Sequence, residues 1–259
     1  MANIKLGPAG LGPVKTADEF LHELHSLDIT ACEIEFVRQI YIKKNDAIKI
    51  GEVAKELNII LSVHCPYYIN LNSEDEEKVE GSKKRILQSC EIAHYIGAKN
   101  VVFHSGFFGK KIPKETYEKI KNGIVYLMSE IKKNNWNVNL CPEIMGKINV
   151  FGSIEEIEKL SRETGCSFCI DFAHILARYK DYKFQDVKNA FPQKNWHCHF
   201  SGIEYGDKGE KNHIKTTKEN WENLLEFLKT TDKEITIINE SPTPLEDSIE
   251  GKKILENLN

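Results

Sequence analysis

The sequence predicts an α/β protein folded as a single (β/α)8 barrel, the TIM-barrel architecture, over residues 1–259. Two observations support this class: short apolar, β-rich runs alternate with longer stretches of helical periodicity, and the alternation repeats eight times. Eight strand–helix units with short connections are typical of a closed parallel barrel, and barrels of this length often form one domain. The sequence contains no linker or low-complexity tract that would mark a second domain.

Each element follows from a local pattern. The predicted strands are residues 3–8, 31–37, 59–65, 100–106, 137–143, 167–172, 195–201 and 234–241. Between them lie amphipathic segments such as "TADEFLHELHSL" and "SIEEIEKLSRETG". Thr16 and Ser153 are predicted N-caps, and Gly97 and Gly165 are predicted helix ends. The sixth unit has the weakest signal, because "ILARYKDYKFQDVKNAF" must supply its return helix.

Composition narrows the class of protein. Hydrophobic residues make up 41% and charged residues 29% of the chain, an ordinary globular balance. The net charge of -4 gives no whole-chain support for nucleic-acid binding, although a local basic groove is compatible with it. Seven cysteines and the lack of an apolar signal sequence predict a reducing, cytoplasmic location. No apolar run is long enough to suggest a membrane span, so no membrane partner is expected.

The segment "GCSFCIDFAH", residues 165–174, contains two competing metal-binding patterns. Cys166 and Cys169 form a C-x-x-C, but the chain has no second such pair or matching histidine pair to complete a zinc clip. We therefore interpret all seven cysteines as small core residues. Asp171 and His174 stand where a strand gives way to a loop or helix, so both can face the mouth of the barrel.

Six consecutive predicted strands each deliver an imidazole or a carboxylate at their carboxyl ends, where barrel active sites lie. These residues are His64, His104, Glu143, Asp171, His199 and Glu240. Carboxylates that converge in one mouth repel each other unless a cation lies among them. Neutral imidazoles and carboxylates suit Zn²⁺, with Mn²⁺ or Fe²⁺ as alternatives, and a set of this size predicts more than one ion. His197 shares a strand face with His199 and is expected to be a supporting, hydrogen-bonded group.

At these residues the chain resembles the endonuclease IV family of apurinic/apyrimidinic endonucleases, within the xylose-isomerase-like barrels. The resemblance covers nearly the whole chain in order, through "HCPYYINL", "FHSG", "CPEI", "FCIDFAH", "CHFSG" and "INESP". It implies that His64 and His104 bind one metal and that Glu143 bridges to a second. Asp171, His199 and Glu240 would complete the second site, and His174 with His213 would belong to a third.

The sequence departs from the family pattern mainly at the third site. The aspartate expected two residues before His213 is Lys211, and Pro66 replaces a serine in the first motif. Either Glu210 or Asp207 completes a weak third site, or the Lys211 ammonium replaces the ion. If metal analysis found three tightly bound ions per chain, it would contradict the idea that Lys211 replaces the third ion.

The resemblance also implies an activity: metal-dependent hydrolysis of the phosphodiester 5′ to an abasic site in DNA, during base excision repair. Glu143 and Glu240 would be the catalytic carboxylates, and no organic cofactor is implied. Damaged double-stranded DNA would be the partner of a monomeric enzyme. Tyr67 and Tyr68 stand where the family inserts side chains into the base stack, and Arg38 and Lys43 are candidate phosphate contacts.

Two other functions are compatible with the sequence. A sugar isomerase or epimerase on the same barrel uses a divalent ion held by Glu, Asp and His, although its site usually needs fewer histidines. A barrel without catalytic activity that binds damaged DNA or a protein is the third possibility, against which the intact ligand set argues.

Overall fold

Within residues 2–258, which the computed structural model describes, eight parallel strands form the inner wall of a barrel. They pair as two four-stranded sheets, ordered β1-β10-β7-β6 and β2-β3-β4-β5. Parallel bridges from Ala9 to Glu33 and from Glu143 to Cys169 join the two sheets into a ring. The predicted barrel is therefore confirmed. The strands are β1 Asn3–Pro8, β2 Ala31–Glu35, β3 Ile60–His64, β4 Asn100–Phe103, β5 Asn139–Pro142, β6 Ile170–Asp171, β7 Asn195–Phe200 and β10 Glu234–Asn239.

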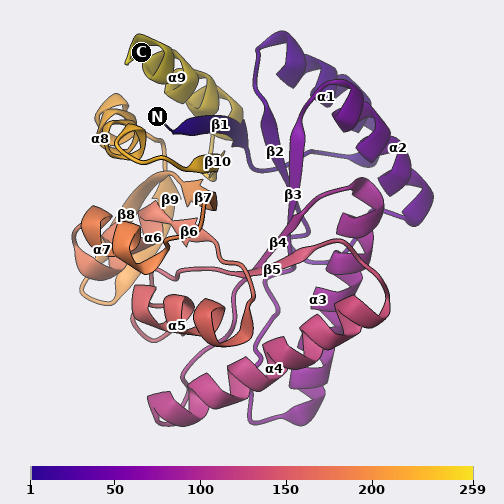
Figure 1. Cartoon of the computed structure of the whole chain (residues 1–259), viewed down its shortest axis with the longest axis vertical. Helices are drawn as coiled ribbons and strands as arrows, with labels where there is room; N and C mark the ends of the chain where they lie inside the picture. The colour runs from indigo at the N-terminus through magenta and orange to yellow at the C-terminus, as the bar shows by residue number, and fades with distance from the viewer. Residues whose placement is uncertain (1, 259) are drawn as a thin grey trace.

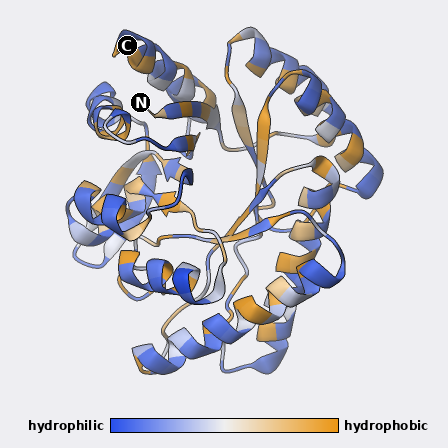
Figure 2. Cartoon of the chain, in the orientation of Figure 1, coloured by the Kyte–Doolittle hydropathy of each residue, from blue (hydrophilic) through white to orange (hydrophobic). Residues whose placement is uncertain are grey.

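Helices surround the strands in chain order, and the last helix, α9, packs beside the first strand, β1 (Figure 1). Apolar residues concentrate on the strands and on the inward faces of the helices (Figure 2). None of the helices within residues 2–258 combines the length and apolar character needed to cross a bilayer. The helices are α1 Ala17–Ser26, α2 Lys44–Glu56, α3 Glu76–Ile96, α4 Pro113–Lys133, α5 Ile154–Thr164, α6 Phe172–Tyr179, α7 Phe184–Ala190, α8 Lys218–Lys229 and α9 Pro244–Asn257, with a 3-10 turn at Val14–Thr16.

Most of the predicted helix boundaries are confirmed. Ser153 forms a capping box with Glu156 at the start of α5, which satisfies backbone N–H groups that the first turn leaves free. Gly97 and Gly165 end α3 and α5 in the left-handed conformation. Thr16 precedes α1 as expected, but its hydroxyl donates to the Pro13 carbonyl oxygen and does not cap the helix.

Two features differ from the sequence-based prediction. The return helix of the sixth unit is split into α6 and α7, because Lys180 and Lys183 adopt left-handed backbone conformations between them. After β7 the chain forms an antiparallel hairpin, β8 Gly202–Gly206 and β9 Gly209–Ile214, before it enters α8. This hairpin was not predicted, and it extends the barrel at the end where the candidate site lies.

The interior of the barrel receives alternate residues of each strand, since side chains two positions apart share a face. Outward residues such as Cys32 and Ile34 of β2 join the main hydrophobic core, which runs from Leu6 to Ile254 and lies between strands and helices. Inward residues make smaller apolar clusters, one of Val102, Cys141 and Cys169. Above these clusters the inward positions become polar, and they form the floor of the candidate site.

Candidate metal centre

The carboxyl ends of the strands open into a pocket of about 480 Å³. Most of its walls are the side chains that end successive strands, with further contributions from the loop after β5 and from the hairpin. Its lining residues are Ala9, Glu35, His64, Tyr67, His104, Phe107, Lys147, His174, Glu210, His213, Glu240, Ser241 and Pro244. The structure thus brings the predicted donors from distant parts of the sequence to one place.

The first donor group consists of His64, His104 and Glu143. The Nε2 atoms of His64 and His104 lie 3.4 and 2.9 Å from Glu143 Oε2. His64 donates a hydrogen bond from Nδ1 to the Cys65 carbonyl oxygen, at 2.8 Å. That bond places the proton of the neutral ring on Nδ1, so that Nε2 is available as a ligand.

The second group consists of Glu143, Asp171, His199 and Glu240. His199 Nδ1 lies 3.2 Å from Glu143 Oε1 and 3.3 Å from Glu240 Oε1. Asp171 caps α6, because its Oδ1 accepts a hydrogen bond from the His174 backbone at 2.7 Å. Its other oxygen, Oδ2, is buried and has no hydrogen bond among the described residues, although it lies 3.2 Å from His174 Nδ1.

The third group consists of His174, Glu210 and His213. His174 Nε2 lies 3.3 Å from Glu210 Oε2, and the two imidazole rings are 5.3 Å apart. His174 donates from Nδ1 to the Ile144 carbonyl oxygen at 2.9 Å, which leaves Nε2 free to act as a ligand. Lys211 lies outside the group, since its side chain is 56% exposed and its Nζ is 3.6 Å from Glu204 Oε1.

The electrostatics of the centre balance imidazoles against carboxylates. Burial opposes ionisation of Glu143, but the imidazoles of His104, His174 and His199 outweigh it and hold its pKa well below the usual range. Burial works against protonation of His64, yet the Glu143 carboxylate raises its pKa to about 9. For Asp171, burial and the nearby Glu143 and Glu240 carboxylates raise the pKa to about 7. The imidazoles therefore stabilise the charge of Glu143, whereas the surroundings of Asp171 disfavour its charged form.

The residues present fit divalent metal ions. In each of the three groups the ligand atoms lie within 4.8 Å of one another. All are nitrogen or carboxylate oxygen atoms, the donors that Zn²⁺, Mn²⁺ and Fe²⁺ accept. Asp171 Oδ2 supports the same conclusion, because it is buried without a hydrogen bond among the described residues and has only the His174 imidazole, 3.2 Å away, beside it.

Sequence reasoning missed two carboxylates of β2. Glu35 lines the pocket, where burial and the Glu240 carboxylate raise its pKa to about 7. Glu33 is fully buried below it, in contact with His197 and His199. The alternation of Glu33 and Glu35 in "ACEIEFV" was the available signal, because residues two apart on a barrel strand face the same side.

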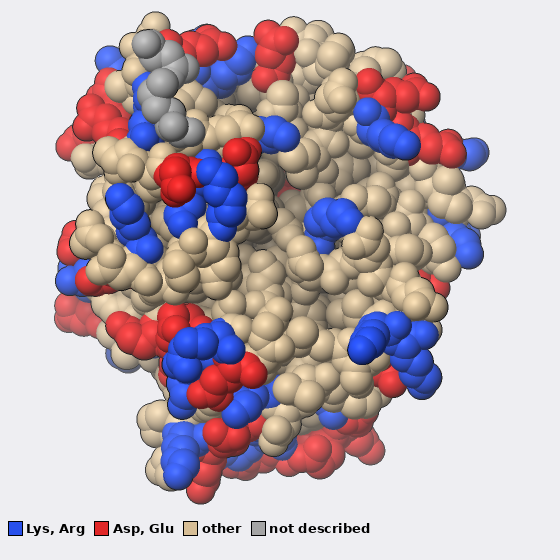
Figure 3. Space-filling view, in the orientation of Figure 1, with Lys and Arg blue, Asp and Glu red and all other residues tan. Residues whose placement is uncertain are grey.

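The candidate DNA-binding residues lie in different places. Tyr67 is half exposed in the pocket, and its ring centroid is 5.8 Å from those of His64 and His104. Tyr68 is 63% exposed. Arg38 lines a separate groove with Pro66 and Arg85, and Lys43 immediately precedes α2. Basic and acidic side chains are interspersed on the face that Figure 3 shows, without a large area of one sign.

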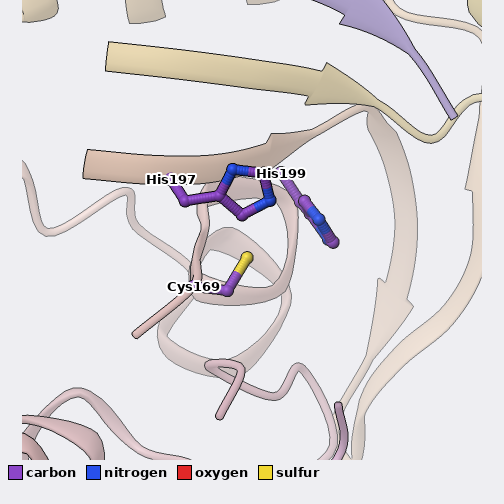
Figure 4. Close-up of side chains that lie close together, drawn as sticks. All are labelled: Cys169, His197 and His199. Atoms are coloured by element: carbon purple, nitrogen blue, oxygen red, sulfur yellow. The ribbon is translucent and has the colours of Figure 1, made fainter. Parts of the chain in front are cut away.

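All seven cysteines are buried and free of disulfides, as expected for core residues. Burial raises the pKa of the Cys166 thiol to about 11 and that of Cys169 well above its usual range. Cys169 lies near His197 and His199 at the inner side of the barrel (Figure 4). The C-x-x-C is therefore not a paired clip.

A model of the xylose isomerase-like TIM barrel family matches residues 21–258, so the chain belongs to that family. An uncharacterized protein of Methanocaldococcus jannaschii, MJ0133, is 39% identical, and the match covers 91% of each chain. A probable endonuclease 4 of Mycoplasmopsis synoviae is 27% identical over 62% of this chain and 58% of that protein. The resemblance to endonuclease IV is confirmed at this level of similarity.

Solved structures show the same fold. Endonuclease IV from Thermus thermophilus superimposes with a TM-score of 0.71 at 19% identity, covering 98% of each chain. A D-psicose 3-epimerase superimposes with a TM-score of 0.68 at 14% identity, covering 98% of this chain and 96% of the other. At these identities the likenesses establish a shared barrel and do not distinguish between the two activities.

Proposed function

We propose that this protein is a metal-dependent phosphodiesterase that incises DNA on the 5′ side of abasic sites. The observation that carries the proposal is the set of three donor groups at one mouth, two of which share Glu143. Its two oxygens face different partners: Oε2 faces His64 and His104, and Oε1 faces His199. A carboxylate in this position suits the bridging role between two ions.

The chain's residues would hold two or three ions, with Zn²⁺ the best match to the donors. His64, His104 and Glu143 would hold one; Glu143, Asp171, His199 and Glu240 the second; and His174, Glu210 and His213 the third. Bound divalent ions supply an activated water at neutral pH and neutralise charge on a phosphodiester. Glu143 would fix the separation of the first two ions, and Glu240 would orient the attacking water.

Aromatic residues at the mouth support a nucleic-acid substrate. Tyr67 and Phe107 line the pocket and are about half exposed, and the exposed Tyr68 follows Tyr67 in sequence. Exposed aromatic rings can occupy the space beside a flipped-out nucleotide, and a nucleotide without its base loses little stacking when it flips. Arg38 and Lys43 would contact phosphates, and the protein would act on damaged duplex DNA as a monomer.

A sugar isomerase or epimerase is the second candidate. Taken alone, Glu143, Asp171, His199 and Glu240 make a carboxylate-rich group that suits one divalent ion beside a small polyol. This alternative gives no role to the first and third groups, which place His64, His104 and His213 around the same pocket. The number of converging imidazoles therefore favours the nuclease.

The test is incubation of the metal-loaded protein with a duplex oligonucleotide that carries one abasic analogue. We expect incision 5′ to the analogue, lost in Glu143→Gln and retained in Glu250→Gln, a matched change at an exposed position on α9. Binding without incision by the wild type would support the function of a binding protein instead. If the wild type neither binds nor incises the duplex, the DNA proposal is overturned and a sugar becomes the substrate to test.

A further inference from the structure

Glu33 is a buried carboxylate that belongs to none of the three donor groups. It lies on β2 with no exposed surface, two residues before Glu35 and on the same side of the strand. A buried carboxylate is costly unless charged or hydrogen-bonding partners surround it. The side chains that contact the Glu33 carboxylate therefore indicate its role.

Three side chains surround the carboxylate. The Ser62 hydroxyl donates to Glu33 Oε2 at 2.7 Å, and His197 donates from Nε2 to the same oxygen at 3.0 Å. Glu33 Oε1 lies 2.9 Å from His199 Nε2. Neither of these last two atoms has a hydrogen-bond partner among the described residues, so their 2.9 Å approach to each other is of ion-pair type.

The His199 ring thus stands between two sets of carboxylates. Its Nε2 faces Glu33, and its Nδ1 faces Glu143 and Glu240 of the second donor group. A carboxylate on one ring nitrogen draws the imidazole proton to that nitrogen and leaves the other to bind an ion. Such a partner also fixes the orientation of the ring.

We propose that Glu33 is a positioning residue for the metal centre, which holds His199 with its proton on Nε2 and its Nδ1 directed at the ion. The inference rests on the part of the proposed function that makes His199 a metal ligand. Ser62 and His197 complete the arrangement by fixing the other oxygen of the carboxylate, so that Oε1 keeps its place beside His199.

A different reading of the same region is a separate metal site made by Cys169, His197 and His199, whose ligand atoms also lie close together (Figure 4). In that reading the thiol is essential. If Glu33 is the positioning residue, the thiol is a packing group in the cluster with Val102 and Cys141, and its removal leaves metal binding intact. Variants of Glu33 and Cys169 therefore separate the two readings.

The experiment measures stepwise Zn²⁺ affinities by competition with a chromophoric chelator, in wild type, Glu33→Gln and Cys169→Ala. We expect Glu33→Gln to weaken one binding step by roughly 10–100-fold, the range that loss of a partner behind a metal-binding histidine costs. Cys169→Ala should leave every step within about threefold of wild type. Imidazole ¹⁵N spectra of the Zn²⁺-loaded wild type should show His199 protonated at Nε2.

Ser62→Ala is a milder second variant in case Glu33→Gln does not fold, and it should weaken the same step by a smaller factor. The inference would be overturned if folded Glu33→Gln kept the wild-type Zn²⁺ affinity at every step. It would also be overturned if Cys169→Ala lost as much Zn²⁺ affinity as Glu33→Gln. Wild type that binds two ions but leaves abasic DNA intact would overturn the nuclease proposal alone. Incision together with unchanged affinity in Glu33→Gln would overturn the positioning role alone.

Discussion

Glu210 and Lys211 are neighbours in the chain, yet their side chains point in different directions and contact different residues. Glu210 is 14% exposed and faces His174, whereas Lys211 extends to Glu204 on the adjacent strand of the hairpin. Residues next to each other in a strand point to opposite faces, so only one of the two can reach the pocket. Of the alternatives that the sequence left open for the third group, the geometry favours Glu210 over the Lys211 ammonium.

We therefore expect Glu210→Ala to weaken the third ion by at least about tenfold, because even residues that only orient a ligand contribute roughly 10–100-fold. Lys211→Ala is the matched control and should leave the ion content unchanged. The measurement is the number of ions per chain after dialysis against buffer of fixed free Zn²⁺, by mass spectrometry of the metals. A loss of the ion in Lys211→Ala and not in Glu210→Ala would contradict this assignment.

At the scale of elements, the β8–β9 hairpin determines whether the third group forms at all. Gly209 has a φ of +92°, and a Cβ there would lie 2.0 Å from the Gly146 carbonyl oxygen. The Gly209 backbone therefore lies directly against Gly146. This close approach, together with the Lys147–Gly209 bridge, holds the hairpin against the loop after β5. Since Glu210 and His213 both lie on β9, the position of the hairpin sets the position of two of the three proposed ligands.

Gly209→Ala should accordingly displace β9, reduce occupancy of the third site by at least about tenfold and leave the first two ions bound. Gly165→Ala is the control, because Gly165 also has a positive φ, of +77°, but its Cβ would meet no atom within 4 Å. It should lower stability by about 1 kcal/mol through backbone strain and leave the ions in place. Equal ion content in Gly209→Ala and wild type would show that the hairpin tolerates the change.

The strands, and the six side chains that converge at their carboxyl ends, could be predicted because each signal is local: a β-rich run that ends in His, Asp or Glu. The hairpin could not, since β8 and β9 are short, glycine-containing and only partly buried, so burial leaves no periodic pattern in the sequence. The role of Glu33 was missed for a different reason. Its contacts to Ser62 and to His197, 164 residues away in sequence, exist only after the barrel closes.

For the whole molecule, ion binding should be coupled to folding. The two groups that share Glu143 join residues in β3, β6 and β7 with residues that directly follow β4, β5 and β10, so bound ions would connect both sheets of the barrel. Without ions, the Glu143, Asp171 and Glu240 carboxylates face one another with only imidazoles to compensate. Because one continuous core runs from Leu6 to Ile254, we expect a single cooperative unfolding transition that shifts as a unit.

Removal of the ions with a chelator should therefore lower the melting temperature by roughly 5–15 °C. A ligand present at about 100–1,000 times its Kd stabilises the native state by about 2.7–4.1 kcal/mol, and each kcal/mol shifts the midpoint of a chain of this size by about 2–4 °C. Differential scanning calorimetry with and without chelator, followed by Zn²⁺ addition to restore the midpoint, measures the effect. Glu143→Gln should show a smaller shift than wild type, because it lacks the carboxylate that joins the first two groups and retains only the third group unchanged. An identical midpoint for wild-type protein with and without chelator would mean that the converging donors do not hold ions, and the proposed catalysis would lose its basis.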